Sequence, residues 1–244
     1  RIPEITRALL MYRYRRLPEA RRLAKEAGFA GAMYPWQSGS NGREESQVLH
    51  LNPRSGRWLP DDTHLQRHVN AGIAYNVWRH YEITGDHEFL FFYGAEMIVE
   101  IARFWASIAT WNAELERYEV KGIVGPDEFH TRYPWRDEPG LDNNAYTNVM
   151  AAWCLLRALD VLDEVGPSRR AELLAMLQPY PEELMRAYPV ELTPRTEPDL
   201  AGYLVLRAEA PDDKLSPLTK EPISETSYLD ATVRRGRNSV PFAT

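Results

Sequence analysis

The chain has 244 residues, of which 44% are hydrophobic and 26% are charged, as is typical of a globular protein with one or two cores. Its formal net charge of -6 argues against nucleic acid as a partner, because nucleic-acid-binding surfaces are basic. No apolar run is long enough to span a bilayer and the first residues show no signal-peptide pattern, so we expect a cytoplasmic protein without membrane contact.

The first helical pattern covers residues 4–27, where apolar side chains recur at helical spacing until Gly28. Pro18 lies inside this pattern and should divide it into two helices. The second helix is expected to begin at Leu17 or Pro18, because proline is favoured in a first helical turn. An irregular stretch follows from Gly31 to Ser46, too rich in glycine, serine and asparagine for a helix.

An aromatic cluster, Tyr34-Pro35-Trp36, interrupts this irregular stretch. One interpretation is that Trp36 fills the core beneath a surface loop. The other is that its flat face stacks on the C–H face of a sugar ring. Both interpretations stay open at this point.

A further helix is expected at residues 63–84, with Asp61 and Asp62 offering an N-cap. His64 and His68 lie four residues apart near its start, which is a metal-ligand spacing on one helix face. No third ligand completes the arrangement, so hydrogen bonding to a hydroxyl-rich ligand, or helix capping, is the better interpretation.

Asp86 is placed to cap the next helix, which runs to about residue 110 and is the most apolar of the chain. Residues 111–121 suit a small hairpin with Tyr118 and Val120 pointing inward.

Another helical pattern covers residues 144–165 and should end at Gly166-Pro167, with Ser168 capping a short helix to about residue 177. The single cysteine, Cys154, is expected to be a core residue of the longer helix. Because helices dominate and no convincing strand pairs of β-branched residues are visible, the predicted fold class is all-α.

The longest irregular stretch runs from Gly122 to Asn148, where prolines and glycines exclude regular structure while apolar residues can anchor the loop. Glu128 is a plausible general acid within it, because partial desolvation and the neighbouring charge of Asp127 both raise a carboxyl pKa. Acid-catalysed cleavage of a glycosidic bond fits this composition best. Alternatively, the two carboxylates cap the loop or pair with Arg132 or Arg136.

Several sequence motifs, which follow one another in the family's order and spacing, together resemble the catalytic domain of family 65 glycoside hydrolases across about residues 5–165. They are MYPWQSGSNGREES, HLQRHVNAGIAYNVWRHY, GAEMIVEIARFWAS, KGIVGPDEFH and LDNNAYTNVMA. This family includes maltose, trehalose and kojibiose phosphorylases and some α-glucoside hydrolases. The resemblance implies an (α/α)6 barrel, inversion at the anomeric carbon, Glu128 as the general acid and Trp36 at the border of the glucosyl pocket.

The predicted site therefore consists of the acid Glu128 and a set of substrate-binding residues, namely Trp36, Gln37, His68, Asn70, Asp127, Asn143 and Asn144. The expected partner is an α-glucosyl disaccharide. No metal or organic cofactor is predicted, and inorganic phosphate would be the co-substrate of a phosphorylase.

Composition changes along the chain, since all seven tryptophans lie at or before Trp153 and nine of the eighteen prolines lie at or after Pro179. We therefore predict a partial (α/α)6 catalytic barrel at residues 1–178 and an unassigned proline-rich tail at residues 179–244. A complete barrel needs more helices than these, and neither a catalytic base nor a phosphate-binding segment is recognised in the tail. The alternative function is a non-catalytic, truncated remnant that at most binds sugar.

A partial barrel should leave apolar helix faces uncovered, and Phe89, Phe104 and Trp153 are the expected examples. We therefore expect marginal stability or self-association, for example as a homo-oligomer.

Overall fold

The computed structural model describes residues 2–126, 131–176, 205–207, 216–217 and 241–243. The chain divides into two compact units, Arg1–Pro189 and Val190–Thr244. In the second unit the described residues form a small antiparallel sheet, in which β5 (Val205–Arg207) pairs with β6 (Ser216–Pro217) and with β7 (Pro241–Ala243). The expected domain boundary after residue 178 lies outside the described residues.

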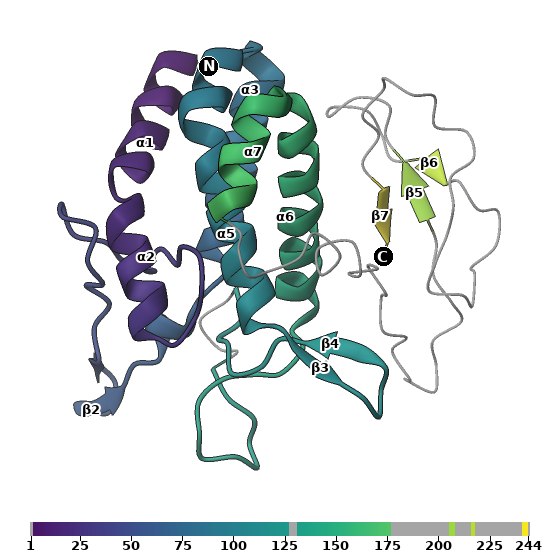
Figure 1. Cartoon of the computed structure of the whole chain (residues 1–244). Helices are drawn as coiled ribbons and strands as arrows, with labels where there is room; N and C mark the ends of the chain where they lie inside the picture. Colours follow the sequence, from purple (N-terminus) through teal and green to yellow (C-terminus); the bar gives the residue numbers. More distant parts are fainter. Residues whose placement is uncertain (1, 127–130, 177–204, 208–215, 218–240, 244) are drawn as a thin grey trace. The chain divides into compact units, whose positions relative to one another are not determined.

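The first unit is mainly helical (Figure 1). Its helical segments are α1 (Pro3–Arg15), α2 (Leu17–Glu26), the 3-10 turn η1 (Thr63–Leu65), α3 (Val69–Thr84), α4 (His87–Phe89), the π-helical turn η2 (Leu90–Gly94), α5 (Ala95–Ile108), α6 (Ala145–Glu164) and α7 (Gly166–Met176). The predicted helical character is confirmed for the described residues, and the (α/α)6 barrel stays a prediction. No described helix is both long and apolar enough to cross a membrane.

The predicted division of the first helical pattern is confirmed. Pro18 lies in the first turn of α2, where its missing N–H leaves no helical hydrogen bond unmade, and α1 ends one residue before Arg16. Gly28 has a φ of 83°, a left-handed conformation that ends the helical run after α2. Asp86 also caps as expected, because its Oδ1 accepts a 2.8 Å hydrogen bond from the backbone N–H of Phe89.

Two helix boundaries differ from the sequence-based expectation. The regular part of α3 begins at Val69, because the preceding residues form the separate turn η1 and Gln66 has a ψ of 75°, outside the helical range. Similarly, α7 already begins at Gly166, two residues before the expected cap Ser168.

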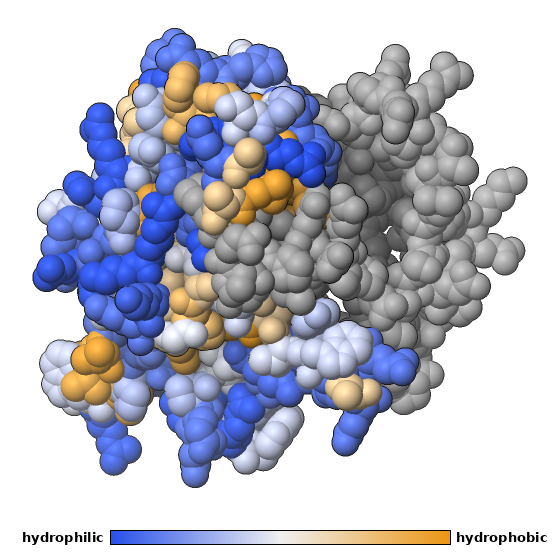
Figure 2. All heavy atoms as spheres, viewed as in Figure 1, coloured by the Kyte–Doolittle hydropathy of each residue, from blue (hydrophilic) through white to orange (hydrophobic). Residues whose placement is uncertain are grey.

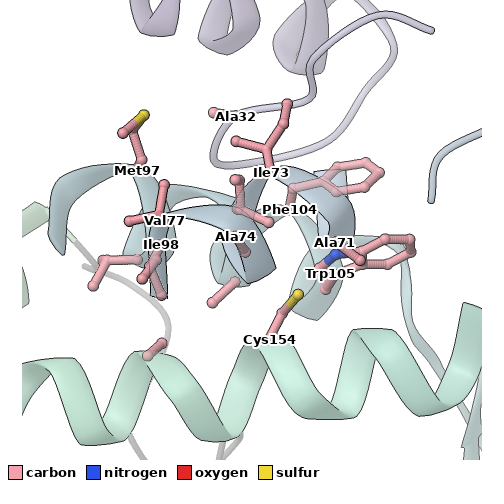
Figure 3. Packing of buried hydrophobic residues seen from close by; sticks show 14 of the residues in the cluster. Ala32, Ala71, Ile73, Ala74, Val77, Met97, Ile98, Phe104, Trp105 and Cys154 are labelled. Carbon is pink, nitrogen blue, oxygen red and sulfur yellow. The ribbon is translucent and has the colours of Figure 1, made fainter. Parts of the chain in front are cut away.

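Helix α5 is the centre of the core, packed against α3 and α6 (Figure 3). Its side chains Met97, Ile98, Phe104 and Trp105 are fully buried, which confirms the expectation that this apolar helix is buried on much of its surface. Cys154 points from α6 toward Trp105 and is completely buried, as expected of a core residue (Figure 3). That burial raises the pKa of its thiol, so the sulfur stays protonated.

The prediction that Phe89 and Phe104 are left uncovered is wrong, because both are completely buried. Phe89 packs edge-on against His80 of α3, with ring centroids 5.0 Å apart, and Phe104 packs against Phe29 in the segment after α2. Trp153 is partly buried. Exposed apolar side chains do remain beside it, and they are Tyr75, Tyr146, Val149 and Leu156 of α3 and α6.

One hairpin was not expected from the sequence, namely the antiparallel pair of β1 (Leu49–Asn52) and β2 (Arg57–Pro60). The sequence hid it because apolar residues do not alternate along β2. Five large apolar side chains in and next to the hairpin are exposed, namely Val48, Leu49, Leu51, Trp58 and Leu59. Figure 2 shows apolar surface in this part of the molecule.

The predicted second hairpin is confirmed as β3 (Thr110–Asn112) paired with β4 (Arg117–Glu119). The expected inward residues are only half right, because Val120 is buried with Glu119, while Tyr118 packs edge-on against Trp111 across the hairpin. The carboxylate of Glu119 can be buried because it accepts hydrogen bonds from Lys121, Asn112 and Asn143. Both hairpins and the loop from β4 to α6 lie at the same end of the helices (Figure 1).

Candidate active site

The loop from β4 to α6 closes on itself at its base. Ile123 and Leu141 exchange two backbone hydrogen bonds of 3.2 and 2.7 Å. Gly140 lies so close that a Cβ built on it would be 2.6 Å from the Gly122 Cα, and its φ is +102°. Only glycine fits such a close approach of two backbones in this conformation.

The same loop is fastened to the segment that leads into α3. The backbone N–H of Val124 donates a 3.0 Å hydrogen bond to the carbonyl of Leu65. Both predicted carboxylates, Asp127 and Glu128, lie outside the described residues. The chain on either side of them is therefore described up to Pro126 and again from Thr131.

Asn143 ties the end of this loop to β4. Its Oδ1 accepts a hydrogen bond of 3.2 Å from the backbone N–H of Val120, and its Nδ2 donates one of 2.8 Å to Oε1 of Glu119. Lys121 and Asn112 also donate to Glu119, and these bonds lower the pKa of its carboxyl group to about 2. Both ends of the Asn143 amide are therefore engaged within the protein.

Asn144 is the N-cap of α6. Its Oδ1 accepts hydrogen bonds of 3.0 Å from the Thr147 N–H and 3.1 Å from the Thr147 hydroxyl. This confirms the predicted start of α6. It also means that Oδ1 of Asn144 already accepts hydrogen bonds within the protein.

Asn70 is completely buried and holds the loop that contains Tyr34. Its Oδ1 accepts a 2.7 Å hydrogen bond from the Tyr34 N–H, and its Nδ2 donates to the carbonyl oxygens of Arg67 at 2.9 Å and Tyr34 at 3.4 Å. The amide thus fixes the residue that comes two positions before Trp36.

Trp36, His68 and Tyr146 bring together three parts of the chain. The Trp36 and His68 ring centroids are 5.2 Å apart, and those of His68 and Tyr146 are 6.1 Å apart. Trp36 is partly exposed, so it is not the buried plug that one interpretation of the sequence described, and Gln37 beside it is exposed. Partial burial lowers the pKa of His68, which keeps its imidazole neutral near neutral pH.

Three buried polar atoms, on residues at most two positions from His68 or Tyr146 in the sequence, have no hydrogen-bond partner within the described part of the chain. They are Nδ1 of His68, Oε1 of Gln66 and Oδ1 of Asn148. Buried polar atoms are normally paired, and an unpaired group at a loop cluster is where a polar ligand gains most from binding.

The alternative partners proposed for Asp127 and Glu128 both hold other carboxylates. Arg132 donates to Oδ2 of Asp62 at 3.1 Å, and Arg136 donates to Oδ2 of Asp142 at 3.1 Å. Among the described residues, no group of three or more His, Cys, Asp or Glu side chains is arranged to hold a metal ion.

Sequence reasoning missed Tyr146, Gln66 and Glu119. Tyr146 belongs to the same LDNNAYTNVMA segment as the two asparagines, so its neighbourhood was already marked. Gln66 lies likewise within the segment HLQRHVNAGIAYNVWRHY, whereas Glu119 precedes the segment KGIVGPDEFH and carried no comparable signal.

A family model described as the glycosyl hydrolase family 65 central catalytic domain matches residues 1–187. An uncharacterized glycosyl hydrolase of Mycobacterium tuberculosis is 55% identical over 177 residues, which are 72% of this chain and 13% of that protein. The trehalose 6-phosphate phosphorylase of Lactococcus lactis is 42% identical, with 75% of this chain and 23% of the relative covered.

Kojibiose phosphorylase of Halothermothrix orenii is 39% identical, with coverage of 69% of this chain and 21% of that protein. A solved structure of a human-microbiome protein assigned as a kojibiose phosphorylase aligns with a TM-score of 0.52 at 27% identity, over 72% of this chain and 22% of that one. The chain thus spans less than a quarter of the length of each of these relatives.

Proposed function

Because this chain belongs to glycoside hydrolase family 65, we propose that the whole protein cleaves an α-glucosidic disaccharide with inversion and that Glu128 is the proton donor. The family resemblance inferred from the sequence is confirmed by the match to residues 1–187. That match is the observation that carries the proposal, since it covers the segment KGIVGPDEFH with Glu128 inside it. We also propose that the first unit is part of an (α/α)6 barrel.

In the proposed reaction, Glu128 gives its proton to the glycosidic oxygen as the bond to the anomeric carbon breaks. An oxygen of inorganic phosphate attacks the same carbon from the opposite face. The products are β-glucose 1-phosphate and the free second sugar. Phosphorolysis is favoured over hydrolysis by the names of the characterised relatives, which include kojibiose and trehalose 6-phosphate phosphorylases.

We propose different roles for the predicted substrate-binding residues. Trp36 would form the floor of the glucosyl pocket, with Gln37, His68 and Asp127 hydrogen bonding to sugar hydroxyls. Asn70, Asn143 and Asn144 would act mainly by positioning the loops, because their amide oxygens and the amide nitrogens of Asn70 and Asn143 bond within the protein.

The test is an assay of the chain, and of a longer parent protein if one is found, with maltose, trehalose, kojibiose and nigerose. Release of β-glucose 1-phosphate and of glucose is measured with and without phosphate. Glu128→Gln should abolish turnover, whereas Glu138→Gln, an exposed acid of the same loop, should leave it intact. Full activity of the Glu128→Gln variant would overturn the assignment.

A second candidate, which the names of the relatives do not favour, is a non-catalytic remnant that at most binds sugar. Calorimetric titration with glucose and maltose separates the cases. Binding without release of any product favours the remnant, and phosphate-dependent turnover excludes it.

A further inference from the structure

Trp135 is the most exposed large apolar side chain described, with 80% of its surface open to solvent. It lies in the loop that contains Glu128, and its ring is stacked on that of Tyr133, with centroids 5.0 Å apart and an interplanar angle of 18°. The guanidinium of Arg136 lies 5.1 Å from the Tyr133 ring centroid. An indole in this position presents a large flat apolar surface to solvent, which the apolar face of a ligand can cover.

The ring beneath Trp135 is firmly held. The Tyr133 hydroxyl donates to the Asp142 carbonyl oxygen and accepts from the Asp142 N–H, both at 3.1 Å. Arg136 adds hydrogen bonds to the Asp142 carboxylate at 3.1 Å and to the Gly140 carbonyl at 2.7 Å. Tyr133 and Arg136 are therefore fixed by hydrogen bonds within the loop, and they form the support on which Trp135 is stacked.

This support is also fastened to the segments that bring His68 and Tyr146 together. Arg132 reaches Asp62, which precedes η1 on the way to His68, and Tyr133 bonds to Asp142, which lies shortly before Tyr146 on α6. These two hydrogen bonds join the loop of Trp135 to the segments that lead to His68 and to Tyr146.

We propose that Trp135, supported by Tyr133, is an outer stacking platform for the second ring of the disaccharide, the ring that leaves when the glycosidic bond is cleaved. The proposal rests on the proposed function. A pyranose ring presents an apolar C–H face that complements a flat indole, and stacking tolerates different linkages because it needs no fixed hydroxyl pattern. The platform would make the loop a determinant of which second sugar is accepted.

Trp111 provides a matched control. It is 55% exposed at the same end of the helices, but it packs edge-on against Tyr118 in the β3–β4 hairpin. The Trp111→Ala substitution therefore removes another exposed indole side chain, from a different loop.

The experiment is calorimetric titration of the full chain with glucose and with kojibiose, trehalose and maltose, using the wild type and the Trp135→Ala, Trp135→Phe and Trp111→Ala variants. Trp135→Ala should weaken binding of the disaccharides about tenfold and leave glucose binding unchanged, because only the disaccharide reaches the platform. Trp135→Phe should keep most of the disaccharide affinity, and Trp111→Ala should match the wild type.

The stacking proposal for Trp135 is overturned if the wild type binds sugars and Trp135→Ala binds disaccharides as tightly as Trp111→Ala does. The proposed function would stand in that case. The stacking proposal is equally overturned if glucose and disaccharides weaken together. A wild-type chain that binds neither glucose nor any disaccharide contradicts both this proposal and the proposed function.

Discussion

Nδ2 of Asn143 donates a 2.8 Å hydrogen bond to Oε1 of Glu119, a carboxylate that is only 5% exposed. This bond joins the end of the loop that carries Glu128 to the edge of the β3–β4 hairpin. The predicted acid is thus held in a loop whose closing residue is fixed by a buried charge. Asn143 itself has a φ of 55°, a conformation that asparagine tolerates better than most residues.

Replacing Glu119 should loosen this closure. Glu119→Gln removes the charge that accepts hydrogen bonds from Lys121, Asn112 and Asn143, and we expect a loss of about 1–2 kcal/mol in the free energy of unfolding. Urea denaturation measures it, with Glu114→Gln on the exposed turn of the same hairpin as the control. Equal midpoints for the two variants would contradict the tether.

The low pKa of the Glu119 carboxyl group predicts that the stability of the fold depends on pH. This pKa is about 2 in the folded protein, against an ordinary value of 4.5, so the folded state binds fewer protons than the unfolded state between these values. The stabilisation is present above about pH 4.5 and is lost as the pH falls toward 2. Stability of the wild type should therefore decrease more steeply than that of Glu119→Gln in this interval, as measured by urea midpoints at successive pH values.

Asn70→Ala should destabilise the protein by about 2–3 kcal/mol, because the N–H and carbonyl of Tyr34 lose a buried partner. Asn76→Ala is the matched control, since Asn76 is exposed on the same helix and should stay within about 0.5 kcal/mol of the wild type. Chemical denaturation of both variants gives the comparison. A loss as small as that of the control would show that the amide does not hold the loop.

The loss of stability in the variants Gly140→Ala and Gly122→Ala should show how much a steric clash costs beyond backbone strain. Both glycines have positive φ, but a Cβ meets the Gly122 backbone at 2.6 Å only at position 140, and nothing lies within 4 Å of one at position 122. We expect Gly122→Ala to cost about 1 kcal/mol and Gly140→Ala clearly more. Thermal melts measure both, and a smaller effect at Gly140 would exclude the close approach of the two strands of the loop.

His68 should titrate below its ordinary pKa of 6.5, because burial favours the neutral imidazole. The unfolded chain then takes up a proton at a higher pH than the folded one, so this residue contributes stability above about pH 6.5 that is lost as the pH falls below that value. Nuclear magnetic resonance titration of the histidine rings, assigned with His68→Gln, tests the direction. A midpoint at or above 6.5 would show that the ring is not desolvated.

Self-association remains a prediction, now with a different surface. The exposed Tyr75, Val149 and Leu156 lie beside the partly buried Trp153 on α3 and α6. Leu156→Glu should lower the average mass seen by sedimentation at a given concentration, whereas Leu115→Glu on the β3–β4 turn should not. A wild type that is monomeric at all concentrations contradicts the prediction.

Helix positions were predictable because their signals are local. Pro18 in a first turn, Gly28 after a helix, and Asp86 and Asn144 as caps act through residues no more than four positions away. The β1–β2 hairpin was missed because its apolar residues face solvent and because Trp58 and Leu59 are adjacent in β2 instead of alternating with polar residues.

The residues alone therefore determined the family, the helical character of the first unit and the loop in which the predicted acid lies, since these depend on ordered local motifs. Tertiary structure decided which polar side chains are already engaged and which stay open. Asn70 meets Tyr34, and Asn143 meets Glu119, across long stretches of chain. Phe104 is likewise covered by Phe29, and the guanidinium of Arg7 lies over the ring of Phe89. Such pairings depend on how helices pack, and no spacing within one segment specifies that.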